Sequence, residues 1–311
     1  MKAIEVENLT KIYKSHSRRN DIMALSNLSL SVQKGQIFGL LGPNGAGKTT
    51  FIKILLGITH PTLGTGSMLG ETIKNYKNKS RVGYLPENHK YPHYLNAEQI
   101  LKYFARLGGY KSNDLTGRID HLLKIVNMEK WKKVKIKKYS KGMMQRLGLA
   151  LSMVNEPEII FLDEPTDGVD PIGRKEIRDI LLKLKSEGKT IFVNSHLLSE
   201  VELISDKVAI LNKGKLIREG SVEELTTTKQ VYQIEIEETP KNTELFNNNN
   251  YSLIESNGNK YTFKFDSSES LNTLIDEIRA KKLNLLSVIP KKHSLEEMFI
   301  NLINDNEKQN L

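Results

Sequence analysis

Cysteine is absent from this chain of 311 residues. Its absence excludes disulfide bonds, thiolate metal sites and thiol nucleophiles, and it fits a reducing compartment. Long apolar runs are also lacking: the longest, such as Ile37–Leu41 and Ile159–Leu162, fall far short of the roughly 18 residues that suggest a membrane span. The first residues, Met-Lys-Ala-Ile-Glu-Val-Glu, lack the apolar core of a signal peptide. We therefore expect a cytoplasmic protein without a transmembrane segment.

The charge balance is basic, with 46 Lys and Arg against 37 Asp and Glu, a formal net charge of +9. Such an excess can attract an anionic membrane surface or nucleic acid. The lysines are scattered, however, and the densest cluster, Lys130–Lys141, does not alternate with aromatic side chains that would stack on bases. We interpret the excess as a solvated, lysine-rich surface and expect no nucleic-acid partner.

The chain is long enough for one large domain, expected at residues 1–222, and a smaller one. Continuous apolar strands in the large domain indicate an α/β fold whose sheet is buried on both faces. Helical spacing of apolar residues between Pro92 and Leu151 predicts a helical subdomain at about residues 88–152. A polar insert, Ser15–Asp21, is expected to be a surface loop. The strands expected in this domain are Ala3–Leu9, Leu28–Val32, Ile37–Leu41, Glu158–Leu162, Thr190–Asn194 and Lys207–Leu211.

Residues 223–311 have a different pattern and are expected to form a small α+β accessory domain. Asn257-Gly258 is typical of a hairpin turn, and Ser294–Glu297 is a capping box that opens a final helix. The asparagine run Asn247–Asn250 is expected to be a loop. The order strand, strand, helix, strand, helix is predicted for the segments Tyr232–Ile236, Tyr261–Phe265, Leu271–Ile278, Leu283–Ile289 and Ser294–Ile303.

A glycine-rich segment follows the strand at Ile37–Leu41 and precedes a helix expected at Thr49–Leu56, which is the context of a phosphate-binding loop. Its glycines let the backbone wrap around phosphates, and the helix N-terminus adds favourable partial charge. We predict that it binds ATP, that Lys48 reaches the terminal phosphates and that the Thr49 hydroxyl is a ligand of Mg²⁺. An ordinary glycine-rich turn would not require Lys48-Thr49. The segment reads Gly42-Pro43-Asn44-Gly45-Ala46-Gly47-Lys48-Thr49-Thr50.

A pair of acids, Asp163 and Glu164, follows the strand at Glu158–Leu162. Ligands of open α/β sheets bind at the carboxyl ends of the strands, where this pair would lie. Asp163 is suited to hold Mg²⁺, and Glu164 to position or deprotonate the water that attacks the γ-phosphate. Solvated acids are common after a strand, so the pair gains its meaning from the phosphate loop that precedes it.

Six ordered motifs between about Ala3 and Gly220 resemble those of the ABC ATPases. The resemblance implies that Tyr13 stacks on adenine and that His196 senses the γ-phosphate and acts with Glu164 in catalysis. It also implies that the signature segment, from Ser140 to Met143, and Asp170 contact ATP. Considered alone, His196 would be an ordinary core or surface histidine. Besides Tyr13, the phosphate loop and the acid pair, the motifs are Tyr139-Ser140-Lys141-Gly142-Met143-Met144-Gln145-Arg146, Thr166-Asp167-Gly168-Val169-Asp170 and Asn194-Ser195-His196.

Two positions depart from the family pattern. The signature segment has Lys141 where a glycine is commoner, which adds charge beside the phosphates. Glu87, in Val82-Gly83-Tyr84-Leu85-Pro86-Glu87, replaces the usual glutamine. A carboxylate can still bind Mg²⁺ or a water, so Glu87 is predicted to be a metal-side and coupling residue.

The resemblance implies a head-to-tail homodimer with two ATP molecules between the subunits. The phosphate loop of one chain would face the Ser140 turn of the other. It further implies a separate transmembrane permease, with this chain peripheral on the inner face of the cell membrane. The C-terminal domain resembles the extension of two-component drug, ion or lipid exporters, which favours export.

Three alternatives remain. A soluble ABC ATPase acting on ribosomes or nucleic acid usually has two cassettes or a coiled-coil insertion, and this chain has neither. A subunit that senses ATP without hydrolysing it would not need Glu164 and His196. A kinase would leave the signature segment unexplained.

Overall fold

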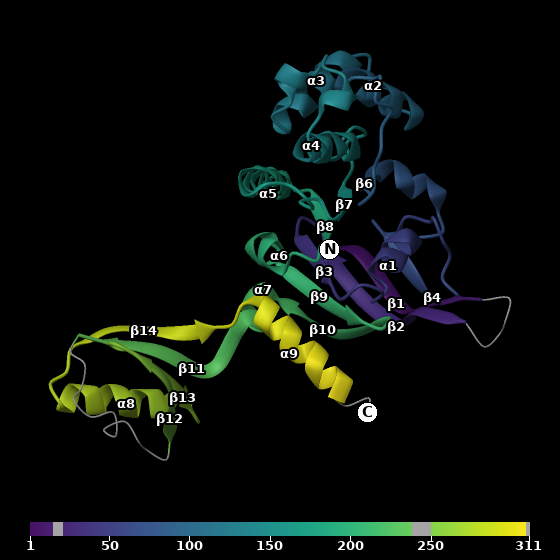
Figure 1. Cartoon of the computed structure of the whole chain (residues 1–311). Helices are drawn as coiled ribbons and strands as arrows, with labels where there is room; N and C mark the ends of the chain where they lie inside the picture. Colours follow the sequence, from purple (N-terminus) through teal and green to yellow (C-terminus); the bar gives the residue numbers. More distant parts are fainter. Residues whose placement is uncertain (15–20, 238–249, 309–311) are drawn as a thin grey trace. The chain divides into compact units, whose positions relative to one another are not determined.

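The computed structural model describes residues 1–14, 21–237 and 250–308. They form two compact units, Met1–Val222 and Glu223–Leu311 (Figure 1). Except for Asp21 and Asn250, the loops expected at Ser15–Asp21 and Asn247–Asn250 lie outside the described residues.

The centre of the first unit is a six-stranded sheet with the order β10-β9-β3-β8-β7-β6. Strands β6, β7, β8, β3 and β9 run parallel, and β10 pairs antiparallel with β9. Every residue of β3, β7 and β8 is buried, as their continuous apolar sequences predict. The strands are β3 (Ile37–Leu41), β6 (Val82–Leu85), β7 (Ile159–Asp163), β8 (Thr190–Asn194), β9 (Lys207–Asn212) and β10 (Lys215–Ser221).

A second, antiparallel sheet has the order β2-β1-β4-β5 and shares one apolar core with helix α1 and the six-stranded sheet. Its first two strands are longer than expected, and they pair as far as Tyr13 and Ile22. Tyr13 is therefore held at the end of a β-ladder rather than in a loop. The elements are β1 (Lys2–Tyr13), β2 (Ile22–Gln33), β4 (Leu63–Met68), β5 (Glu71–Thr72) and α1 (Lys48–Leu55).

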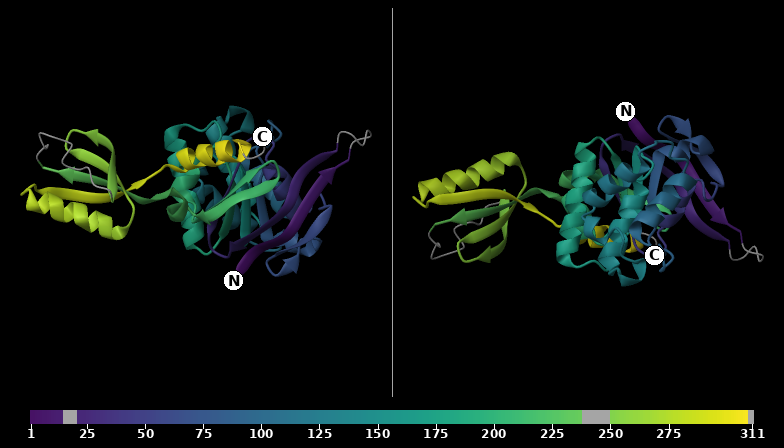
Figure 2. Two further views of the ribbon diagram at one scale, coloured as in Figure 1. Left: turned by 90° about the horizontal axis from the view of Figure 1, so that it is seen from below. Right: turned by 90° about the horizontal axis from the view of Figure 1, so that it is seen from above.

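Helices α2, α3 and α4 lie together on one side of the six-stranded sheet, in the range where a helical subdomain is expected (Figures 1 and 2). A capping box begins α2, with Asn96 and Gln99 each accepting a hydrogen bond from the other's backbone N–H. Between α4 and the end of the unit, β7 and β8 alternate with α5 and α6. The helices are α2 (Ala97–Leu107), α3 (Leu115–Ile125), α4 (Lys141–Ser152), α5 (Pro171–Ser186) and α6 (Leu198–Ile204).

The second unit is an antiparallel sheet, in the order β12-β13-β11-β14, with α8 along one face (Figure 2). The turn at Asn257-Gly258 and the capping box at Ser294–Glu297 are confirmed. The expected element order was wrong by one strand, β12. Its burial does not alternate, because a register shift follows Leu253, so the period-two signal is lost. After α7 (Val222–Thr226), the elements are β11 (Thr227–Ile236), β12 (Tyr251–Asn257), β13 (Lys260–Phe265), α8 (Ser268–Ala280), β14 (Leu285–Lys292) and α9 (Leu295–Lys308).

Candidate nucleotide-binding site

The turn between β3 and α1 owes its path to glycine. Gly42 and Gly47 have φ angles of 155° and 101°. A Cβ atom would lie 2.4 Å from the carbonyl oxygen of Leu211 at the first position and 2.3 Å from that of Ala24 at the second. Only glycine fits either position without a backbone shift. The loop is therefore pressed against β9 and β2.

Lys48, the first residue of α1, keeps its ammonium group inside this loop. The side chain is almost fully buried, and Nζ donates to the carbonyl oxygens of Gly42, at 2.7 Å, and Pro43, at 3.1 Å. Burial lowers the pKa of Lys48, and neighbouring carboxylates, Glu164 foremost, oppose that shift. An anion bound in the loop would compensate this charge.

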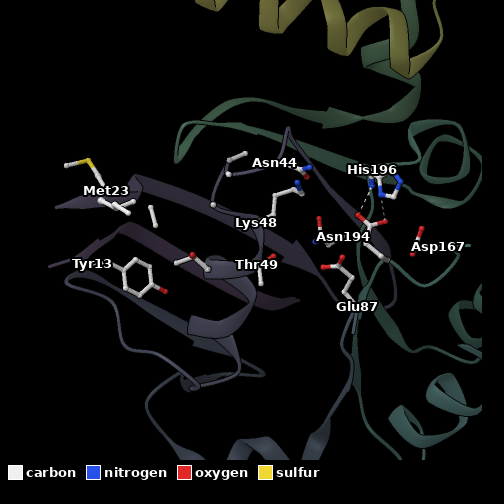
Figure 3. A pocket seen from close by; sticks show the side chains of 16 residues that line it. Tyr13, Met23, Asn44, Lys48, Thr49, Glu87, Asp167, Asn194 and His196 are labelled. Atoms are coloured by element: carbon white, nitrogen blue, oxygen red, sulfur yellow. Dashed lines mark hydrogen bonds and ion pairs between the residues drawn. The ribbon is translucent and has the colours of Figure 1, made fainter. Parts of the chain in front are cut away.

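A cleft of about 580 Å³ opens in front of the loop (Figure 3). This volume is in the range of small-molecule sites, about 300–1,000 Å³. Residues 44–50 line it, and so do four predicted site residues from distant parts of the sequence: Tyr13, Glu87, Glu164 and His196. Gly42 and Pro43, by contrast, lie at the start of the loop outside the lining. The fold thus brings together, around one cleft, the residues predicted to bind adenine, to bind the phosphates and to activate the attacking water.

Asp163 and Asn194 end the neighbouring parallel strands β7 and β8 and are paired in register. Both are 3% exposed, and the Asn194 amide Nδ2 donates to Asp163 Oδ1. Burial raises the pKa of Asp163, whereas the hydrogen bond from Asn194 acts in the opposite direction. Of these two residues, only Asn194 lines the cleft; Asp163 lies next to it at the carboxyl end of β7.

Glu164 is held in a turn at a positive φ of 53°. Its Oε1 accepts from the backbone N–H of His196 at 2.9 Å, and its Oε2 accepts from the Ser195 hydroxyl at 3.1 Å. His196 Nδ1 lies 2.8 Å from the same Oε2, while the histidine side chain remains 54% exposed. The carboxylate is thus oriented by the segment after β8, and the imidazole extends into the cleft.

The opposite end of the cleft is apolar. Tyr13 faces Met23 across it, and Ile22 adds aliphatic surface (Figure 3). Lys11 Nζ lies 4.9 Å from the centre of the Tyr13 ring, a cation–π contact. An aromatic ring beside aliphatic and thioether groups suits a flat purine. Because the cationic loop lies at the other end, the cleft matches a nucleotide, which has a flat base at one end and anionic phosphates at the other.

Comparison with known proteins agrees with this geometry. Residues 25–167 match the family model described as ABC transporter, and residues 220–303 match the model described as ATP-binding protein DrrA1-3-like, C-terminal domain. An uncharacterised ABC transporter ATP-binding protein of Nostoc is 38% identical over 309 residues, 96% of this chain and 89% of the relative. The bacitracin transport ATP-binding protein BcrA of Enterococcus faecalis is 35% identical over 308 residues, 96% of each chain.

This chain belongs to the ABC transporter ATP-binding proteins. Among solved structures, a dimeric ATP-binding cassette in a post-hydrolysis state with ADP and Pi matches with a TM-score of 0.64 and 25% identity, over 70% of this chain and 98% of that one. The chain is accordingly an ATPase, and the predicted fold class and family are confirmed. Across the described ranges, no helix has the length and apolarity needed to cross a bilayer.

The signature segment of this ABC protein does not line its own cleft, although Lys141 contacts one of the lining residues, Asp167. Ser140 caps α4 by accepting from the Met143 N–H at 3.2 Å, and Lys141 Nζ binds Asp167 Oδ2 at 2.7 Å. Asp170 caps α5. The structure therefore does not bring five predicted ATP contacts together with the phosphate loop of the same chain: Ser140, Lys141, Gly142, Met143 and Asp170.

The residues present fit a magnesium ion. Thr49 and Glu87 offer oxygen atoms to the cleft, and Asp163 is a buried carboxylate whose raised pKa a nearby cation would offset. Within the described part of the chain, no group of three or more His, Asp and Glu side chains could hold a metal alone. Mg²⁺ is usually held by one or two carboxylates together with substrate phosphates.

Several residues that the structure places at the site had been given no role from the sequence. Asn194, Ser195 and Asp167 belong to the motifs quoted above, and Met23 belongs to none. Asn194 carried a signal, because it is a polar residue at the carboxyl end of an apolar strand, as Asp163 is. Met23 carried none, since its position depends on the register between β1 and β2.

Proposed function

We propose that this chain is the ATP-hydrolysing motor of an ABC exporter, that it drives a separate transmembrane permease, and that it sits at the inner face of the membrane. The observation that supports this most is one cleft lined by a phosphate loop, the Glu164 carboxylate and a histidine, with the buried Asp163 carboxylate beside it. The C-terminal unit, matched to a DrrA-like C-terminal domain, and the relative named for bacitracin transport support the exporter assignment.

In this proposal, the two ends of the cleft bind ATP. Tyr13 stacks on adenine, while Lys48 and the backbone of residues 42–50 hold the phosphates. Lys48 exchanges its present partners, the carbonyl oxygens of Gly42 and Pro43, for phosphate oxygens. Because the ammonium is already desolvated, this exchange requires little further loss of water.

Thr49, Asp163 and Glu87 are the residues that would hold Mg²⁺. When bound, the ion would neutralise charge on the phosphate oxygens. Glu87 is exposed, whereas Asp163 is buried. Glu87 can therefore contact both the metal side of the cleft and a neighbouring protein, which suits its proposed coupling role.

Glu164 is proposed as the general base. It takes a proton from the water that attacks the γ-phosphorus, and the bond to the departing ADP oxygen breaks. The hydrogen bonds from Ser195 and from the backbone of His196 fix the direction of the carboxylate. The exposed ring of His196 is then free to contact the γ-phosphate.

Two copies of the chain complete each site. The five predicted ATP contacts that do not line their own cleft are available to the cleft of a second copy. Ser140 and the N-terminus of α4 offer a hydroxyl and backbone N–H groups to the γ-phosphate. A two-fold head-to-tail homodimer satisfies both sites at once. ATP then joins the subunits, and hydrolysis releases them.

The permease assignment is tested by purifying the tagged full chain from detergent-solubilised membranes. We expect a hydrophobic multi-helix protein to co-purify and to change the ATPase rate. The Lys48→Ala variant is the matched control, since it should retain this partner but show no ATPase activity for the partner to modulate. Recovery with ribosomal RNA or DNA, and without a membrane protein, would replace the exporter motor with a soluble ABC ATPase.

A further inference from the structure

Asn194 occupies a position that the proposed roles leave unused. It is the last residue of β8, it is 3% exposed, and its side chain lines the nucleotide cleft between Lys48 and Glu87 (Figure 3). The other residues of β8 are apolar except for Thr190 at its start. A buried polar side chain at this end of the strand requires a hydrogen-bonding reason.

The orientation of the Asn194 amide follows from its neighbour. An ionised carboxylate only accepts hydrogen bonds, so the NH₂ group must face Asp163. Nδ2 indeed donates to Asp163 Oδ1. The amide oxygen is therefore directed away from that carboxylate, and it is buried with no hydrogen-bond partner among the described residues. A buried acceptor of this kind is normally satisfied by a donor such as an ordered water.

We propose that Asn194 is a positioning residue for ATP hydrolysis, whose NH₂ group fixes the Asp163 carboxylate and whose amide oxygen accepts a hydrogen bond from a water beside it in the cleft. This inference rests on the proposed role of Asp163 as a Mg²⁺ ligand. Residues that orient a metal ligand in this way usually change metal affinity or activity about 10–100-fold when they are replaced.

A merely structural role would give a different result. If Asn194 only satisfied a buried carboxylate, its loss would lower stability without changing how much Mg²⁺ the protein needs. A positioning role instead separates two quantities. The Mg²⁺ requirement should rise, while ATP binding without Mg²⁺ should stay the same, because the phosphate loop and the Tyr13 end of the cleft are untouched.

Two variants of the full-length chain test this separation. Asn194→Val places a residue suited to a buried strand at the position, and it removes both polar atoms. Asn194→Ser keeps a polar atom on a shorter side chain that cannot both reach Asp163 and face the cleft. Asn155→Ala is the matched control, because Asn155 Oδ1 is also buried without a partner among the described residues but lies in a second hollow, away from the nucleotide cleft.

The measurements are the Mg²⁺ concentration for half-maximal ATPase activity and the affinity for ATP by calorimetry, with Mg²⁺ and with EDTA. For both Asn194 variants we expect about a tenfold rise in the Mg²⁺ requirement and a matching loss of Mg²⁺-assisted ATP affinity. Affinity in EDTA should stay within about twofold of wild type, and Asn155→Ala should behave as wild type.

An unchanged Mg²⁺ requirement in either folded Asn194 variant overturns the inference. If the Val variant does not fold, the Ser variant decides. A wild-type chain that gains no ATP affinity from Mg²⁺ would instead refute the proposed function itself.

Discussion

Substitutions at Gly45 and Gly47 distinguish backbone strain in the phosphate loop from a steric clash with a neighbouring strand. Both have positive φ, but a Cβ at residue 47 would meet the Ala24 carbonyl oxygen at 2.3 Å, whereas one at residue 45 meets nothing within 4 Å. Gly47→Ala should abolish detectable ATP binding because the loop must move. Gly45→Ala should cost only the backbone strain, about 1–2 kcal/mol, or roughly tenfold in affinity. Calorimetric titration with ATP checks this; equal losses would contradict it.

Asp163 makes the stability of the nucleotide-free protein depend on pH. Burial raises its pKa in the folded state, so the associated stability is full below the ordinary value and is lost as pH rises through the raised one. Asp163→Asn cannot ionise. It should raise Tm at pH 7 by about 2–4 °C for each kcal/mol relieved, and the gain should vanish below about pH 4. Calorimetric melts across pH test this, and an equal gain at all pH values would refute it.

Glu87 stands where the family resemblance implies a glutamine. Glutamine keeps an oxygen for Mg²⁺ or a water and removes a negative charge near the phosphates. Glu87→Gln should therefore retain ATPase activity within about threefold. Steady-state phosphate release provides the measurement. Complete loss of turnover in a folded variant would show that the carboxylate itself is required.

At this scale, the sequence could predict those residues whose proposed chemistry depends on a local motif. The phosphate loop and the Asp163-Glu164 pair each come at the end of an apolar run, and this context can be recognised in the sequence alone. The Ser195 partner of Glu164 was not visible, because Ser195 meets it only through the parallel pairing of β7 with β8. Register between strands distant in sequence is a property of the folded sheet.

Helix α4 carries the signature segment and offers a comparison between neighbours. Ser140→Ala removes the N-cap and should cost about 0.5–2 kcal/mol. Lys141→Ala breaks an ion pair whose side chains are 57% and 42% exposed, so it should change stability by less than about 1 kcal/mol. ATP-dependent pairing of two chains should be lost in Ser140→Ala and kept in Lys141→Ala.

Urea unfolding and sedimentation velocity with Mg²⁺–ATP provide these two readouts. If Lys141→Ala prevented pairing as completely as Ser140→Ala, the hydroxyl of Ser140 would not be the distinguishing contact.

The elements themselves were predictable where burial is uniform or strictly periodic. Strands β3, β7 and β8 are buried throughout, and their apolar runs allowed them to be placed within a residue or two. Strand β4 was not expected, since its sequence, Leu-Gly-Thr-Gly-Ser-Met, has two glycines and its pairing with β1 maintains it. Strand β12 escaped because a register shift interrupts its alternation.

The whole molecule consists of two units with separate cores. Every residue that lines the nucleotide cleft belongs to Met1–Val222. The second unit has its own apolar cluster, in which Tyr251, Phe263 and Phe265 pack around one another. The residues that line the cleft thus all come from the first unit, and the second unit packs around a core of its own.

Nucleotide-dependent pairing of two chains is the central claim, and Glu164→Gln tests it most directly. This variant keeps the shape of the site but removes the proposed general base, so ATP should bind and persist. Light scattering after size exclusion should give twice the monomer mass with Mg²⁺–ATP and the monomer mass with Mg²⁺–ADP. A variant that binds ATP yet stays monomeric in both would contradict the account.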